Sequence, residues 1–213
     1  MTESAGKVGT LLIVLLTSYF YTIRFGSKRK KAKIFFKSVF ALGLLLAAFA
    51  FFNEHITKKA LKLIRPSYTF VVKQSGVNIK TSSLYDLNEQ DRKEAFQHII
   101  NTHTERFIKI EPKVLNHWIE ESGYSFPSGH SFNAFLLAFI MAYSMYHSAN
   151  RIARYFYMLP FCWATMVGIS RVAMGAHTPL DVSFGAAMGL VVAILFLYFD
   201  NTKKLVIPSK SNK

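Results

Sequence analysis

Three clusters of polar residues in this 213-residue sequence have the composition of an anion-binding and nucleophilic site. They read K-x6-R-P (Lys58 to Pro66), P-S-G-H (Pro127 to His130) and S-R-x5-H-x3-D (Ser170 to Asp181). Together they supply three cations, two imidazoles, a glycine turn and a carboxylate. Cations combined with free backbone N–H groups suit a tetrahedral oxyanion that carries two or more charges.

The first cluster places two cations seven residues apart. Lys58 and Arg65 are separated by two helical turns, so they are predicted to lie on one helix face together with Lys62. Pro66 is predicted to end that helix. Alternatively, these cations only snorkel to a membrane edge.

The second cluster reads as the start of a helix. Gly129 lets the backbone approach a ligand closely, and a helix beginning there would offer free N–H groups to an anion. Ser128 adds a donor, and His130 titrates near neutral pH. The alternative is an ordinary helix cap followed by a surface histidine.

The third cluster joins the end of one apolar stretch to the start of the next, at Arg171 and Asp181. If the turn is helical, Asp181 is within hydrogen-bond reach of His177 and could hold one ring nitrogen while the other stays free. Alternatively, Thr178, Pro179 and Asp181 form a capping box.

No metal or cofactor is expected. The chain has a single Cys and no evident group of carboxylates for Mg²⁺ or Ca²⁺. The chemistry that remains for a phosphate site is attack of a histidine on phosphorus.

The overall composition favours a membrane protein. A net charge of +14 could indicate nucleic-acid binding, but 51% of the residues are hydrophobic and the mean hydropathy is +0.23. We therefore expect membrane lipids as partners and no nucleic acid.

Apolar stretches that could position the clusters are predicted to be helical spans, since a span needs about 20 apolar residues. These stretches run from Val8 to Ile23, Ile34 to Phe52, Ser131 to Tyr146, Tyr155 to Ser170 and Pro179 to Phe199.

Charge asymmetry predicts the topology. The segments after the first, third and last stretches carry Lys and Arg without acids near the spans: Arg24 to Lys33, Arg151 to Arg154, and Lys203 to Lys213. The segment Asn53 to His130 holds 11 Lys+Arg and nine Asp+Glu. The positive-inside rule puts the N-terminus and all three clusters outside, and the C-terminus inside.

The ordered motifs resemble the type 2 phosphatidate phosphatase and vanadium haloperoxidase superfamily, in its membrane lipid phosphatase branch. His117-Trp118-x2-Glu121 ahead of Pro127 is also similar, more loosely, to bacterial phosphatidylglycerophosphatase B enzymes. The resemblance implies an all-α, polytopic bundle of about five to six spans, with an extracytoplasmic loop region between the second and third. We expect one domain over residues 1–213, with residues 53–126 as the insert.

The resemblance also implies the residue roles. His177 would be the nucleophile that forms a phosphohistidine, Asp181 would orient it, and His130 would protonate the leaving oxygen. The phosphate oxygens would be bound by Lys58, Arg65, Ser128, Gly129 and Arg171.

The expected function is metal-independent hydrolysis of a lipid phosphate on the outer face of a bacterial cytoplasmic membrane. Candidate substrates are phosphatidylglycerol phosphate, undecaprenyl pyrophosphate, phosphatidate and the phosphates of lipid A. The alternatives are a lipid phosphotransferase that uses the same phosphohistidine, and a non-catalytic lipid-binding protein.

Overall fold

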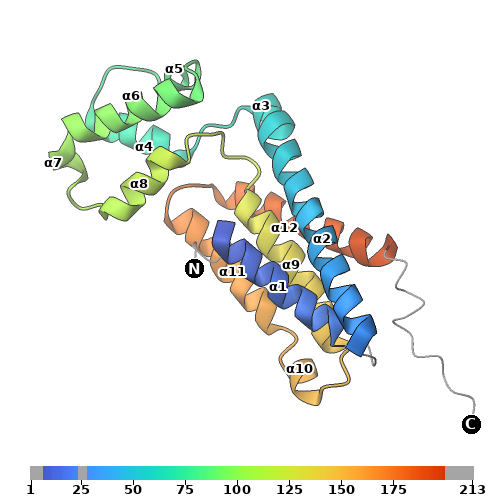
Figure 1. The fold of residues 1–213 in the computed structure, drawn as a ribbon. Helices are drawn as coiled ribbons and strands as arrows, with labels where there is room; N and C mark the ends of the chain where they lie inside the picture. The colour runs from blue at the N-terminus through green and yellow to red at the C-terminus, as the bar shows by residue number, and fades with distance from the viewer. Residues whose placement is uncertain (1–6, 24–27, 200–213) are drawn as a thin grey trace, which may run out of the picture.

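The computed structural model describes residues 7–23 and 28–199 of the chain (Figure 1). Within those ranges the regular structure is helical and no strand occurs, which confirms the all-α prediction. Arg24 and the segment from Lys203 to Lys213, both used to predict topology, lie outside the described residues.

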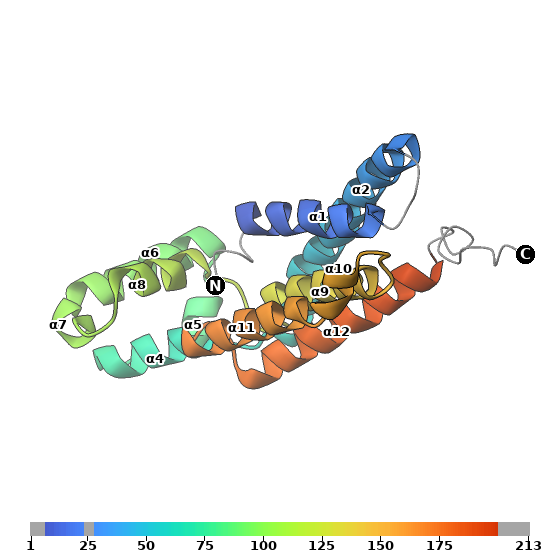
Figure 2. The same cartoon turned by 90° about the horizontal axis from the view of Figure 1, so that it is seen from below.

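The long apolar helices form an antiparallel bundle, in which successive helices run in opposite directions (Figures 1 and 2). They are α1 (Lys7–Thr22), α2 (Lys28–Phe52), α9 (Gly129–Tyr146), α11 (Leu159–Ala173) and α12 (Pro179–Phe199). The short helix α10 (Arg151–Tyr155) caps one end of the bundle. The alternation brings the end of α2 and the starts of α9 and α12 to the opposite end.

Most of the predicted stretches match the helices closely. α1 and α12 agree with the apolar stretches to within a residue or two. α2 begins earlier than predicted, at Lys28, because the basic cluster is itself helical. α11 begins later, at Leu159, because Asn150 caps a separate helix through its side-chain oxygen and that helix ends at Tyr155.

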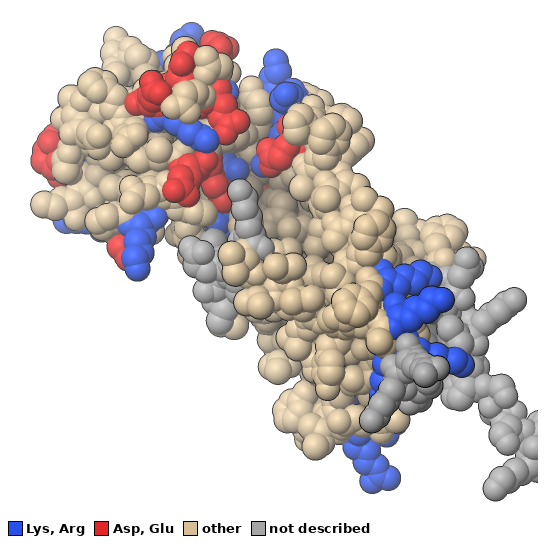
Figure 3. Space-filling view, viewed as in Figure 1, with Lys and Arg blue, Asp and Glu red and all other residues tan. Residues whose placement is uncertain are grey.

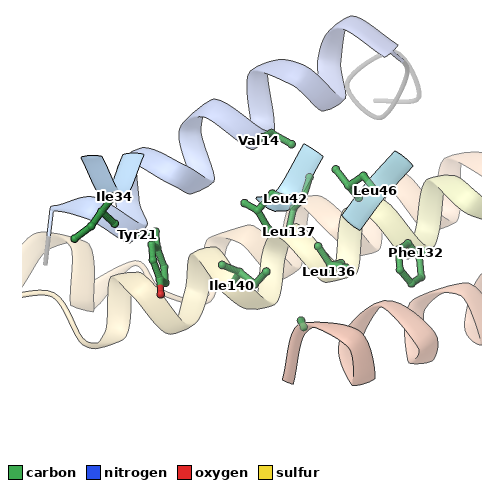
Figure 4. Packing of buried hydrophobic residues seen from close by; sticks show 10 residues of the cluster. Val14, Tyr21, Ile34, Leu42, Leu46, Phe132, Leu136, Leu137 and Ile140 are labelled. Atoms are coloured by element: carbon green, nitrogen blue, oxygen red, sulfur yellow. The ribbon is translucent and has the colours of Figure 1, made fainter. Parts of the chain in front are cut away.

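Helix α9 lies at the centre of the bundle and contacts α1, α11 and α12. Its Phe132, Leu136 and Ile140 are fully buried and pack with Leu42 of α2 and Val14 of α1 (Figure 4). Burial of such side chains stabilises a fold by about 1.5–3 kcal/mol each in water. This packing positions the N-terminal end of α9, which carries the P-S-G-H cluster.

Two glycines allow α12 to approach α9 at backbone distance. A Cβ atom on Gly185 would meet the carbonyl oxygen of Ser128 well inside 3.0 Å, and one on Gly189 would meet that of Phe132 equally closely. Small residues four apart are a common way for membrane helices to pack closely. The contact at Gly185 also joins the start of α12 to the P-S-G-H turn.

We expect Gly189→Ala to destabilise the bundle by about 1–3 kcal/mol or more, because the obstructing atoms belong to the backbone of α9 and cannot rotate away. Gly43→Ala in α2 is the matched control, since nothing lies within 4 Å of its added Cβ. Thermal unfolding in detergent should show a clear loss for Gly189→Ala and none for Gly43→Ala. Equal unfolding temperatures for the two variants would refute the close packing.

The outer segment folds into a small helical unit at one end of the bundle (Figure 1). Its helices are α4 (Pro66–Ser75), α5 (Thr81–Tyr85), α6 (Glu89–Thr102), α7 (Thr104–Phe107) and α8 (Pro112–Glu120). They enclose a separate core that includes Tyr68 and Phe96, whose rings stack at 3.8 Å. Residues 108–111 separate α7 from α8 and are not helical, and Pro112 starts α8.

On the face shown in Figure 3, the middle of the bundle lacks the Lys, Arg, Asp and Glu side chains that gather toward its two ends. Two helical segments are long and apolar enough to cross a membrane, Lys30–Leu61 and Pro179–Phe199, and two shorter apolar helices accompany them, Val8–Thr22 and Leu159–Ala173. Many large apolar side chains on these helices are exposed, which is typical of a membrane-facing surface. Examples are Leu11, Leu12, Phe36, Phe40, Leu44, Ile169, Val191 and Ile194.

Candidate active site

A cavity of about 250 Å³ lies between the end of the bundle and the outer helical unit. Residues from all three predicted clusters line it: Lys58, Arg65, Gly129, His130 and His177. The other predicted residues are buried next to this lining rather than in it: Ser128, Arg171 and Asp181. The motifs that are far apart in the sequence therefore meet at one site.

The first cluster does not lie on a continuous helix, so that prediction was wrong. α2 continues through a π-helical turn η2 (Asn53–Thr57) into α3 (Lys58–Leu61), and the helix stops where Lys62 adopts a left-handed φ of 50°. Arg65 is extended, as residues before proline usually are, and Pro66 begins α4 instead of ending a helix. Lys62 is exposed and does not line the cavity.

The second cluster begins α9, as predicted. Ser128 is the N-cap residue, and its hydroxyl oxygen accepts a hydrogen bond from the backbone N–H of Ser131 at 3.4 Å. Gly129 and His130 form the first turn and face the cavity. The turn is therefore a helix cap and a cavity wall at the same time.

The third cluster contains the capping box. The Asp181 carboxylate accepts a hydrogen bond from the backbone N–H of Thr178 at 2.8 Å, and the Thr178 hydroxyl oxygen accepts one from the N–H of Asp181 at 3.2 Å. The same carboxylate oxygen lies 3.6 Å from Nδ1 of His177, slightly beyond hydrogen-bond distance. Asp181 thus caps α12 and also faces the imidazole.

His177 presents its other nitrogen to a cation. Nη1 of Arg65 lies 3.4 Å from Nε2 of His177, and because a guanidinium only donates, Nε2 must be the acceptor. The proton of the neutral ring is then on Nδ1, facing Asp181. The unprotonated Nε2 therefore carries a lone pair and lies beside the Arg65 guanidinium.

The surroundings of His177 keep its ring neutral. Burial lowers its pKa to about 4, the Arg65 and Arg171 guanidiniums act in the same direction, and Asp181 opposes them. A ring with this pKa is unprotonated at neutral pH, as a nucleophile must be.

The lowered pKa of His177 predicts acid sensitivity. As the pH falls from about 6.5 toward 4, an unfolded chain takes up a proton at this ring that the folded chain does not, so the folded state should lose about 3 kcal/mol of stability. His177→Gln should remove that part of the loss. Unfolding of both proteins in detergent across this pH range measures the difference, and parallel profiles would contradict a buried neutral ring.

A carboxylate that the sequence analysis assigned no role occupies the centre of the site. Oε2 of Glu121 accepts a hydrogen bond from Nη1 of Arg65 at 2.8 Å and another from Nη2 of Arg171 at 2.5 Å. One oxygen atom therefore bridges two of the three predicted phosphate-binding cations. Glu121 follows α8 directly and lines the cavity.

The electrostatics confirm a strong interaction at Glu121. Burial would raise the pKa of its carboxyl, but Arg65 and Arg171 outweigh burial and hold that pKa at about 2. The remaining cation is also paired, since Lys58 forms an ion pair with Glu54 one turn earlier. Each of the three predicted cations thus has a carboxylate partner.

His117 completes this arrangement. Its Nε2 accepts a hydrogen bond from Nη1 of Arg171 at 2.8 Å and lies 3.3 Å from Oε1 of Glu121. Burial is the main reason that the pKa of His117 is lowered. The helical spacing of His117 and Glu121, four residues apart just before the P-S-G-H turn, was the sequence signal for this pair. Glu54 and Lys58 have the same spacing.

Comparison with known proteins finds related bacterial proteins. The chain is 36% identical over 106 residues to phosphatidylglycerophosphatase B of Bacillus subtilis, covering 43% of this chain and 52% of that protein. It is 27% identical over 113 residues to the bacitracin transport permease protein BcrC of Bacillus licheniformis, covering 46% of this chain and 50% of that protein. The chain thus spans about half the length of these relatives.

The family assignment rests on a longer match. The family model described as "PAP2 superfamily" matches residues 36–205. This range includes all three clusters and every element that lines the cavity. This chain therefore belongs to the PAP2 superfamily.

Proposed function

We propose that this protein is an integral-membrane phosphatase that releases phosphate from a lipid through a phosphohistidine. The observation that carries the proposal is the position of Nε2 of His177, unprotonated and 3.4 Å from Nη1 of Arg65 in a cavity that His130 also lines. A nucleophile, a phosphate-binding cation and a proton donor are then available in one site.

The proposed reaction has two steps. Nε2 of His177 attacks phosphorus and forms an N–P bond as the bond to the lipid oxygen breaks. His130 must take part as an imidazolium, which the negative charge of the bound phosphate would stabilise, and it gives its extra proton to that oxygen. Water then attacks the phosphohistidine, His130 accepts a proton from it, and phosphate leaves with His177 restored. Arg65, Arg171 and the N–H groups of the α9 turn would stabilise the negative charge on the equatorial oxygens.

No step of this scheme uses a metal ion. The carboxylates nearest the cations are already paired, Glu54 with Lys58 and Glu121 with two arginines. Groups of three or more His, Cys, Asp or Glu side chains suited to a metal are absent from the described residues.

The site is proposed to face the outer side of a bacterial cytoplasmic membrane. The loop between α9 and α11 supports this orientation, because it carries Arg151 and Arg154 at the end of the bundle opposite the cavity. With α1 included as a span, the bundle crosses the membrane five times, and residues 53–126 form the extracytoplasmic insert.

Reporter fusions test this topology. We expect fusions after Lys33 and after Lys213 to report a cytoplasmic position, and a fusion after Ile108, which is exposed in the outer unit, to report the outside. An outside signal at Lys33 or Lys213 would reverse the proposed orientation.

The substrate is proposed to be a phosphate monoester or pyrophosphate carried by a lipid. Phosphatidylglycerol phosphate is favoured by the name of the Bacillus subtilis relative. Undecaprenyl pyrophosphate, phosphatidate and the phosphates of lipid A present the same group at the membrane surface. A phosphotransferase would share the first step and pass the phosphoryl group to a second lipid instead of to water.

The test is phosphate release by the purified full-length protein from each of these lipids in detergent, with and without EDTA and without any acceptor lipid. Release that EDTA leaves intact is the expected result. A parallel assay adds an acceptor lipid, and phosphoryl transfer seen only there would favour the phosphotransferase. A requirement for added Mg²⁺ would contradict the metal-free reaction, and neither release nor transfer from any lipid would contradict the enzyme.

A further inference from the structure

The carboxylate of Glu121 lies where a substrate phosphate would have to bind. Its Oε2 is shared between Arg65 at 2.8 Å and Arg171 at 2.5 Å, and Arg171 is fully buried behind it. A phosphate cannot reach Arg171 from the cavity while Glu121 holds both guanidiniums. Ligand binding must therefore displace this carboxylate.

The surroundings of Glu121 allow the displacement. Its side chain is 22% exposed, against 5% for Arg65 and 0% for Arg171, so it is the least enclosed member of the group. Both arginines bond the same oxygen, Oε2, whereas the second oxygen, Oε1, lies 3.3 Å from Nε2 of His117.

We propose that Glu121 is a displaceable internal anion: it occupies the phosphate site of the empty protein and so keeps the abundant phosphodiester lipids of the bilayer from filling it. This inference rests on the proposed function, in which Arg65 and Arg171 bind the substrate phosphate. Glu121 is then the residue that sets the minimum affinity with which a lipid can occupy the site.

The physical basis is that displacing Glu121 requires the same free energy for every ligand. Any anion that enters must first displace Glu121, so every apparent affinity is reduced by the same factor, the fraction of protein with the arginines open. A phosphate monoester can carry two negative charges, whereas the diester of an ordinary phospholipid carries one. The reduction leaves the dianion bound but brings the weaker monoanion below saturation, even at its high concentration in the membrane.

A pair of ligands that differ by one charge and one methyl group tests this directly. Dodecylphosphonate cannot be hydrolysed at its C–P bond and carries two charges at suitable pH, and its monomethyl ester carries one. Calorimetric titration of the detergent-solubilised protein with each compound gives both dissociation constants for the wild type, Glu121→Gln and Glu120→Gln. Glu120 is the matched control, because it lines the same cavity without contacting either arginine.

We expect Glu121→Gln to tighten the binding of both compounds by the same factor of about ten or more, because the competing charge is gone. Glu120→Gln should tighten neither compound to that extent. A much larger gain for the dianion would show that the carboxylate repels ligands without being displaced, and would overturn the proposal. Unchanged or weaker binding of both compounds would overturn it as well.

Two further measurements keep the outcome clear. If Glu121→Gln does not fold, Glu121→Ala should tighten the binding of both compounds by one common factor. Saturation of the wild type by the monomethyl ester, at the concentration that a lipid reaches in a micelle, would refute the proposal without any variant. Phosphatidate turnover by the wild type is measured separately. Turnover without the predicted gain defeats only the role of Glu121, whereas the gain without turnover defeats only the proposed reaction.

Discussion

Replacing His177 by alanine is expected to lower the rate of phosphate release from a lipid phosphate by about 10⁴-fold or more, down to background. The reason is that His177 supplies the only attacking atom in the proposed reaction, Nε2, which lies beside Nη1 of Arg65. Loss of the nucleophile should affect every substrate alike, because attack on phosphorus precedes departure of any leaving group.

A matched control separates lost chemistry from lost folding. His98 is exposed on α6 and does not line the cavity, so His98→Ala should keep its activity. Thermal unfolding of both variants shows whether the fold survives. A folded His177→Ala protein that retains more than a small part of the wild-type rate would show that another group attacks phosphorus.

Replacing His130 by alanine is expected to have the second-largest effect, and one that depends on the leaving group. General acid catalysis contributes about 10²–10⁴-fold when the leaving oxygen is strongly basic. A lipid alkoxide needs that proton, whereas p-nitrophenolate leaves without much help. The variant should therefore lose far more rate with phosphatidate than with p-nitrophenyl phosphate, and an intermediate amount with undecaprenyl pyrophosphate.

The same substrate series also gives the opposing results. Equal losses with all three substrates would mean that His130 binds phosphate and does not donate a proton. No loss with any of them would reduce the P-S-G-H turn to the helix cap that Ser128 already forms. His130 and His177 line the same cavity, so one bound substrate could contact both rings.

The convergence of the three clusters could be predicted from the sequence because it follows from topology. Apolar stretches of span length alternate in direction, and Arg171 and Asp181 flank the same turn. The start of α9 at Gly129 was predictable as well, since Ser128 is a strong N-cap residue. These are local signals, each written within a few residues.

The path from Lys58 to Arg65 was mispredicted because two local effects compete there. The left-handed φ of Lys62 ends α3, and Pro66 extends Arg65 and starts a new helix. Pro66 was interpreted as a stop when it is a start. The positions of the two cations in the cavity therefore depend on tertiary contacts, such as the hydrogen bond from Nε of Arg65 to the carbonyl oxygen of Gly123.

The pairing of the two arginines could not be read from the motifs. Glu121 is 56 residues from Arg65 and 50 from Arg171 along the chain, and only the docking of the outer helices places it between them. Arg92 contributes to that docking, since its guanidinium donates from Nη1 to the carbonyl oxygen of Ser122 at 2.8 Å. Motif analysis finds groups that can bind phosphate, but it does not show what they bind in the empty site.

The central claim, a phosphohistidine on His177, is tested most directly by trapping it. The protein is mixed briefly with phosphatidate, quenched under alkaline conditions that preserve an N–P bond, digested and analysed by mass spectrometry. The account predicts one phosphoryl group on the peptide that contains His177, removed by mild acid and absent from His177→Ala. A phosphoryl group on any other residue, or turnover without a covalent intermediate, would contradict it.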